Sequence, residues 1–216
     1  MINIIKNTRY KIFYISPKDV KYCIYPSKKC DYTQFQLSKL HPHAGKNRGV
    51  FREDPMGYIK INSSEWDKRP GILFSSLLEY QALFNHFNGK QNWKDSKFSK
   101  RYFNYIQIKK LKDRNLNYKN KNDFLNKREK QIDKLFESIL KQGVLPANNK
   151  KNKKLFIDNI SLVLTDKNEL YFNNRGHHRL SIAKILGLSE IPIKITLAKS
   201  TKKLEIFNSK LSYIRT

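Results

Sequence analysis

The chain has 216 residues, of which 39% are hydrophobic and 12% aromatic. This length suits one domain of moderate size and this apolar content can form a buried core, so a wholly disordered chain is excluded. No apolar run approaches the ~20 residues of a membrane span, and Lys6 comes too early for a secretion signal. Cys23 and Cys30 are too few for a disulfide scaffold, so we expect a soluble, cytoplasmic protein.

The net charge is +26, from 44 basic and 18 acidic residues. Such an excess is typical of proteins that bind nucleic acid, phosphorylated ligands or acidic membrane surfaces. The basic residues comprise 34 lysines and 10 arginines, accompanied by 21 asparagines and 22 isoleucines, a bias that the codons of an AT-rich genome also produce. Nucleic acid therefore stays an open partner, because phosphate affinity depends on clustered charges rather than on their total.

The first third of the chain predicts short strands separated by loops. Apolar residues favour strands over Arg9–Ile15 and Tyr58–Ile61. Ser16 and Pro17 are typical of a helix start, with serine as the cap and proline in the first turn. Residues 25–57 lack a sustained hydrophobic period and are expected to be mostly loop, and Ser64–Gly71 is expected to be a charged turn.

The middle of the chain predicts three helices. Ser76–Glu79 matches a capping box at the start of the first helix, which Gly89 ends. The second helix is expected over Phe98–Leu111, and the third from Asn122 or Asp123 to Gly143, a residue suited to a left-handed helix end. We therefore expect a single domain over 1–216 with a helical insertion over 75–142.

A strongly basic stretch includes the end of this insertion. Between Lys109 and Lys154 there are 15 basic and 5 acidic residues, and an exposed basic linker is expected over 143–155. Such a run either is simply solvated or contacts a phosphate backbone, and both interpretations stay open.

The last third predicts a compact βαβ-like unit. Strands over Ile160–Leu164 and Leu170–Asn173 form a hairpin, and a turn ending in Gly176 leads to a helix over His177–Leu186. A final strand follows over Pro192–Leu197. The expected fold is therefore α/β (α+β), with a small mixed sheet on which this helix packs.

Basic side chains gather where the hairpin meets this helix: Arg175, Gly176, His177, His178 and Arg179. The first turn of a helix has unpaired amides and a partial positive charge, so basic side chains there are unfavourable unless an anion binds. Glycine allows the backbone to approach a ligand closely, and arginine and histidine supply directed donors, so the pattern suits a phosphate. The alternative is that these are surface residues and that an arginine bridges to an acid. No metal-ligand set is assigned, because adjacent helical residues such as His177 and His178 point in different directions.

The segment from Gly176 to Gly187, followed by Ile191-Pro192-Ile193, resembles the phosphate-binding box of the ParB/sulfiredoxin superfamily. The likeness covers Phe156–Leu197 well and is weaker upstream. In this superfamily the glycine, the basic pair and the helix amides hold nucleotide phosphates. The resemblance implies these roles for Gly176, His178 and Arg179, with His177 at a variable position.

The chain departs from the family pattern in two respects. Sulfiredoxins have a catalytic cysteine inside the box, where this chain has His177, so reductase activity is not expected. Chromosome-partitioning members continue into a helix-turn-helix domain, whereas only about 20 residues follow Ile195, too few for such a domain. Other members of the family resemble kinases or nucleases that use the same phosphate-binding box, and these two activities remain open for this chain.

Phosphoryl transfer needs a carboxylate near the phosphates, to bind a metal or to take a proton. Glu65 and Asp67 are the first candidates, although they also suit a charged turn paired with the basic residues that follow, and Asp158 and Asp166 are weaker. Asp67 and His178 are the predicted catalytic residues.

The leading functional hypothesis is a nucleotide-binding enzyme, an ATP-dependent phosphotransferase (kinase) or nucleotide hydrolase. It would use ATP or another nucleoside triphosphate, with Mg²⁺ and an unidentified acceptor. The second hypothesis is a DNA-binding protein or ParB-like nuclease, in which the basic stretch tracks the phosphate backbone. The third is a non-catalytic nucleotide-binding module.

Overall fold

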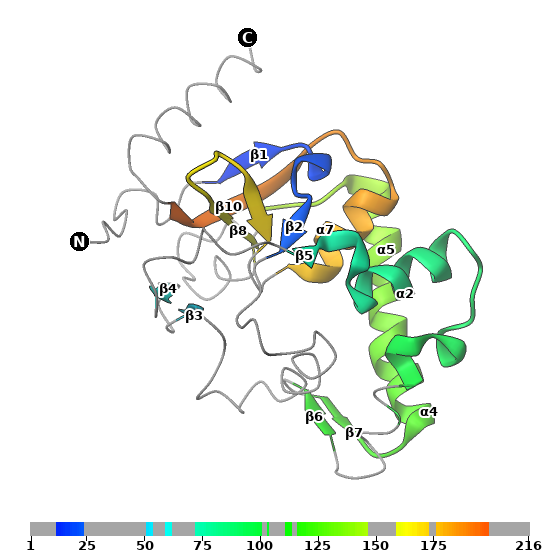
Figure 1. Ribbon diagram of the computed structural model, residues 1–216. Coiled ribbons are helices and arrows are strands. Elements are labelled where there is room, and N and C mark those ends of the chain that lie inside the picture. The colour runs from blue at the N-terminus through cyan, green and yellow to red at the C-terminus, as the bar shows by residue number, and fades with distance from the viewer. Residues whose placement is uncertain are drawn as a thin grey trace.

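A mixed α/β architecture is described by the computed structural model, in which a sheet packs against a group of helices (Figure 1). The structure describes residues 12–23, 51–53, 59–61, 72–100, 103, 111–113, 116–146, 159–172 and 176–198. Helix α7 (His177–Ile185) lies where the two parts meet, in contact with β8 of the sheet and with helices α2 (Leu78–Phe87) and α5 (Lys130–Gln142). Its first turn therefore stands at the junction of both parts of the fold.

The sheet has six strands in the order β1-β10-β8-β9-β2-β5. Parallel pairs join β10 to β8 and β2 to β9, and the remaining neighbours run antiparallel. The strands are β1 (Phe13–Ile15), β2 (Tyr22–Cys23), β5 (Ile72–Leu73), β8 (Ile160–Leu164), β9 (Leu170–Phe172) and β10 (Ile191–Ala198).

Strand β8 lies in the middle of the strand order, and every one of its residues is buried. An uninterrupted apolar sequence of this kind is typical of a strand covered on both faces. Strand β9 pairs with it antiparallel, with Leu164 opposite Leu170 and Leu162 opposite Phe172. The chain therefore leaves β9 at the same end of the sheet as Ile160, the first residue of β8.

The helical part is built from short segments joined to α2 and α5. A single 3-10 turn, η4 (Phe74–Ser76), precedes α2, and a second, η5 (Trp93–Asp95), precedes a helical segment over 97–100. Before α5 the chain forms α4 (Lys121–Phe124) and a π-helical turn, η6 (Leu125–Glu129).

The two long helices of this part are joined by an aromatic stack. The rings of Phe87 on α2 and Phe136 on α5 lie 3.8 Å apart between centroids at an interplanar angle of 11°. Ile132 and Ile139 are buried on α5, and Gly143 ends the helix at a φ of 69°. That left-handed conformation is the reason for glycine at this position.

Most of the predicted elements in the last third are confirmed. Strands β8, β9 and β10 and helix α7 lie within one or two residues of their expected bounds. Near the N-terminus, Ser16 caps the 3-10 helix η2 (Pro17–Asp19), as its sequence predicts. Within the described residues, no helix combines the length and apolarity that crossing a bilayer requires.

Not every local prediction is confirmed. The capping box at Ser76 does not form, because Leu77 is the cap residue of α2 and the Ser76 hydroxyl donates to the Leu73 carbonyl (2.7 Å). Of the stretch 25–57, which is expected to be mostly loop, the structure describes only strand β3 (Phe51–Glu53), which pairs with β4 (Ile59–Ile61), so that expectation stays a prediction.

Another difference lies inside the expected helical insertion. Leu111 belongs to a hairpin of β6 (Leu111–Asp113) and β7 (Leu116–Tyr118) rather than to the end of a helix. Residues 147–155 of the expected basic linker lie outside the described residues.

Candidate functional site

The candidate site is the first turn of α7. Gly176 is the cap residue of the helix, at φ 80° and ψ 21°, a left-handed conformation that glycine adopts readily. It has no side chain with which to cap the helix, and the first turn contains no acidic residue. Arg175 lies outside the described residues, so its predicted role stays a prediction.

Glycine at position 176 also allows α7 to start very close to the sheet. A Cβ atom there would lie 2.7 Å from the Ile160 Cα and 2.8 Å from the Ile160 Cγ1. Both contacts are shorter than real Cβ atoms make, and one of them is to backbone. This packing against strand β8 requires glycine whether or not a ligand binds, and the predicted close approach to a ligand stays a prediction.

His177 lies in an aromatic cluster, which consists of Phe74, Tyr80, Phe172 and His177. Its ring stacks on Phe74, with centroids 5.2 Å apart and an interplanar angle of 27°, and meets Phe172 edge-on at 5.6 Å. Phe74 is 1% exposed and also contacts Phe172 and Tyr80. Packing against these rings is therefore sufficient to explain why a planar, aromatic side chain stands at position 177.

His178 and Arg179 complete the first turn, and both residues are half-buried. The His178 ring meets the His177 ring edge-on, with centroids 5.9 Å apart. The positive end of the helix thus carries histidine and arginine side chains without an acid in the same turn.

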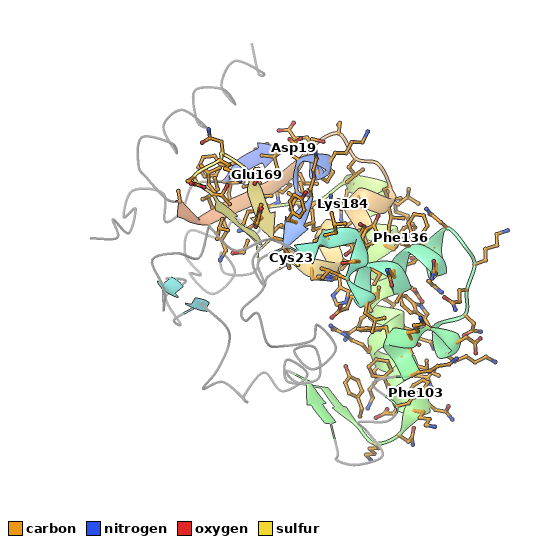
Figure 2. The ribbon with its side chains drawn as sticks, viewed as in Figure 1. Asp19, Cys23, Phe103, Phe136, Glu169 and Lys184 are labelled. Atoms are coloured by element: carbon orange, nitrogen blue, oxygen red, sulfur yellow. The ribbon has the colours of Figure 1, made fainter. Side chains whose placement is uncertain are left out.

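Two turns further along α7, Lys184 contacts the same Phe74 ring. Its Nζ lies over the ring, 5.6 Å from the centroid, and donates to the Pro17 carbonyl oxygen at 2.6 Å. Burial lowers the pKa of Lys184 to about 8, although the charge of nearby Asp19 acts in the opposite direction. Figure 2 labels Lys184 and Asp19. Phe74 therefore contacts α7 at both His177 and Lys184.

The predicted carboxylates do not gather at this turn within the described residues. Glu65, Asp67 and Asp158 lie outside those residues. Asp166 lies in the β8–β9 turn, at the opposite end of the hairpin from Gly176, and the five residues of β8 correspond to roughly 13 Å. The described parts of the chain contain no group of three or more histidine, cysteine, aspartate or glutamate residues that could hold a metal ion.

The sequence analysis missed the partners that position the first turn. Phe74 and Lys184 were not singled out, although His177 and Lys184 are seven residues apart and so share a helix face. Phe74 precedes His177 by about 100 residues, and no local pattern links them.

No protein-family model, curated protein or solved structure matches this chain. Functional inference therefore depends on the chemistry of the first turn of α7 and of the residues around it. That chemistry suits a small anion: a glycine-started helix, first-turn basic side chains, and a rigid support formed by β8 and the aromatic cluster.

Proposed function

We propose that the first turn of α7 binds the phosphate groups of ATP or another nucleoside triphosphate, and that the protein is an ATP-dependent phosphotransferase or nucleotide hydrolase. The observation that supports the proposal is the half-buried pair of His178 and Arg179 at a helix start that has no acidic residue. The ParB/sulfiredoxin type of fold, implied by the resemblance of Gly176–Gly187, belongs to the same proposal.

The electrostatic argument gives the sign of the effect. A basic group beside a helix N-terminus is unfavourable, with a magnitude of typically 0.3–1 kcal/mol per group. A phosphate reverses that sign, because the amides, the dipole and the basic side chains then all attract it. A guanidinium adds paired, directed hydrogen bonds that suit phosphate oxygens.

Each residue has a distinct role in this proposal. Arg179 and His178 bind phosphate oxygens, and Arg175 adds a further cation beside them. Gly176 starts the helix against the sheet, and His177 holds the turn against the aromatic cluster. Asp67 binds Mg²⁺ or accepts a proton, and the metal, when bound, neutralises phosphate charge. His178 is the second proposed catalytic residue.

Thermal-shift measurements with ATP, CTP and ADP, with and without Mg²⁺, test the proposal. A nucleotide at about 100 times its Kd stabilises the folded protein by about 2.7 kcal/mol. Arg179→Ala is expected to weaken binding by about tenfold or more, because the paired hydrogen bonds are lost. Lys141→Ala removes one exposed positive charge from α5 and serves as the matched control.

The outcomes separate the enzyme from its alternatives. Equal nucleotide shifts in the wild type and Arg179→Ala, or no shift in either, contradict the proposed phosphate site. If nucleotide binding depends on Arg179, but neither release of phosphate nor transfer to an added acceptor is detected, the result supports the non-catalytic nucleotide-binding module instead. Loss of turnover with retained binding in Asp67→Asn supports the catalytic role of Asp67.

A second candidate function, nucleic-acid binding, is favoured by the distribution of charge in the helical part. Asp123 pairs with Lys127 at 2.7 Å, Glu129 is buried, and Asp133 accepts a hydrogen bond from Trp93. Among the residues of 72–146 whose exposure the structure describes, ten lysines and only two acids are nevertheless exposed. The lysines are Lys90, Lys94, Lys97, Lys100, Lys119, Lys121, Lys127, Lys130, Lys134 and Lys141, and the acids are Asp95 and Glu137.

Filter binding to duplex and single-stranded DNA across a salt series tests this second function. Binding through several lysines to phosphates makes the affinity fall steeply with salt, by a slope of about 0.9 per phosphate contact on duplex DNA. A slope near zero excludes it. Lys130→Ala combined with Lys134→Ala should reduce the slope, because these two residues occupy one outer face of α5.

A further inference from the structure

A buried acidic group that the proposed function does not use lies in the helical part. Glu129, the last residue of the π-helical turn η6, is 2% exposed. It belongs to two neighbouring groups of hydrogen-bonded side chains from three segments, which together we term the Glu129 cluster. Its members are His86 on α2, Trp93, Ser96 and Ser99 on the segment that follows, and Glu129 and Asp133 at the start of the α5 region.

Two buried serines connect Glu129 to the segment over 93–100. The Ser96 hydroxyl accepts the Ser99 backbone N–H at 3.0 Å and donates to the Ser99 hydroxyl at 2.9 Å. The Ser99 hydroxyl in turn donates to the Glu129 Oε1. Ser96 and Ser99 are themselves buried, so solvent does not compete for these bonds.

Asp133 connects the same region of α5 to α2. Its Oδ1 accepts the Trp93 indole N–H at 2.9 Å and lies 3.3 Å from the His86 Nε2. The other ring nitrogen of His86, Nδ1, lies 2.7 Å from the Gln91 carbonyl oxygen. Both ring nitrogens therefore face acceptors, and the protonated ring can donate to both at once.

Ionisation of Glu129 is unfavourable in these surroundings. Burial raises the pKa of its carboxyl from an ordinary 4.5 to about 7, the Ser99 hydrogen bond acts against that rise, and the charge of Asp133 adds to it. Of the other charged groups nearby, Asp123 of α4 and Lys127 of η6 form an ion pair with each other. Within the cluster, His86 is the basic group, and it contacts Asp133 rather than Glu129.

Glu129 also stands at the end of a π-helical turn. Such turns are rare and occur mostly as single turns within α-helices. Here it ends at the buried carboxyl, and Asp133 follows four residues later on the next turn. Like charges at this spacing destabilise a helix, so loss of the Glu129 proton destabilises the turn, although the Ser99 hydrogen bond acts in the opposite direction because it favours the charged carboxylate.

We propose that the Glu129 cluster is a proton-sensitive contact, which holds α5 against α2 and the segment over 93–100 while Glu129 is protonated and loosens when Glu129 ionises. The folded state keeps this proton between about pH 4.5 and about pH 7, where an exposed glutamate has lost it. The stability of the contact therefore falls as the pH rises through that window. The device depends on no nucleotide and is independent of the function proposed above.

Hydrogen exchange measured by mass spectrometry tests this inference on the full chain. Protection factors, corrected for the intrinsic pH dependence of exchange, are compared between about pH 5 and about pH 8. In the wild type, protection of residues 86–100 and 125–133 should fall by up to about tenfold per pH unit within the window. Glu129→Gln resembles the protonated acid and should remove that dependence. Glu137→Gln changes an exposed acid of the same helix and should retain it.

A second variant keeps the inference open to contradiction if Glu129→Gln fails to fold. Ser99→Ala removes the hydrogen bond that favours the charged carboxylate, so the loss of protection should move to higher pH. A purely structural role of Ser99 would lower protection at every pH without moving this transition. The same pH profile in the wild type and Glu129→Gln, or an unmoved transition in Ser99→Ala, would overturn the proposal.

Discussion

The first turn of α7 and the Glu129 cluster both place ionisable groups where they are electrostatically unfavourable, but they differ in what surrounds those groups. In the cluster, Glu129 is 2% exposed and its partner is the buried hydroxyl of Ser99. At α7, His178 and Arg179 are half-buried at the positive end of a helix whose first turn has no acid. A buried group with an internal partner responds to protons, whereas a partly exposed cationic turn can respond to an anion from outside.

The supports of the two regions differ as well. The α7 turn is built on the sheet, with Gly176 tight against Ile160 of the central strand. The Glu129 cluster joins helical segments through side-chain hydrogen bonds and a π-helical turn. We therefore expect the α7 turn to hold its geometry over a broad range of conditions and the cluster to change with pH.

The largest expected effect is on the rigid region. Gly176→Ala should lower the free energy of unfolding by about 3 kcal/mol or more, because it combines a left-handed backbone with a clash against Ile160. Gly187→Ala is the matched control, since Gly187 has a φ of 64° but open space around its Cβ position, and should lose about 1 kcal/mol. Urea unfolding measures both variants. Equal losses would show that the close approach to β8 is not what requires glycine.

The next largest effect is a pH-dependent change in stability at Glu129. At about pH 8, Glu129→Gln should be more stable than the wild type by about 2 kcal/mol, because it avoids burying a charge. At about pH 5 the two should be nearly equal, since Glu129 is then protonated in the folded state. Urea unfolding at both pH values gives the comparison. A difference of the same size at both pH values would contradict the proton linkage.

Lys184 should give a pH dependence of opposite sign. Its pKa is lowered by burial from 10.5 to about 8, so the unfolded chain binds the extra proton between these values. Stability should therefore rise with pH in that window, by about 2 kcal/mol at most. Thermal unfolding of Lys184→Met should lack this rise, whereas Lys141→Met, an exposed lysine on α5, should keep it. A wild-type stability that is flat in this window would argue against the linkage.

The smallest effect concerns Ser181, one turn after His177 on α7. Its Oγ is fully buried and makes no hydrogen bond within the described part of the chain. Removing a buried hydroxyl that lacks a partner is nearly neutral or stabilising, so Ser181→Ala should gain about 1 kcal/mol or less. If urea unfolding instead shows that Ser181→Ala lowers the free energy of unfolding by more than about 1 kcal/mol, the hydroxyl has a partner in the folded protein.

Short sequence patterns were sufficient to predict the helices and strands that are determined by neighbouring residues. Strand β8 was recognisable from its apolar run, α7 from its spacing, and the end of α5 from Gly143. The capping box failed because Leu77, rather than the serine before it, became the cap of α2. The π-helical turn η6 was missed, because such turns are rare and this stretch has no sequence period that marks one.

The candidate site was also predicted only in part. The first turn of α7 was recognisable because its basic residues contradict the helix dipole within five consecutive positions. Phe74, Phe172 and Lys184, which position it, come from separate elements and could not be grouped without the fold. The roles of Arg175 and Asp67 stay predictions.

The position of Phe74 has a consequence for how α2 and α7 can move. Its ring contacts His177 and Lys184, which lie seven residues apart on α7, and its residue is only four positions before the start of α2. Sliding α2 along α7 by a single residue, roughly 1.5 Å, would disturb both ring contacts together. Phe74 therefore fixes the axial register between α2 and α7.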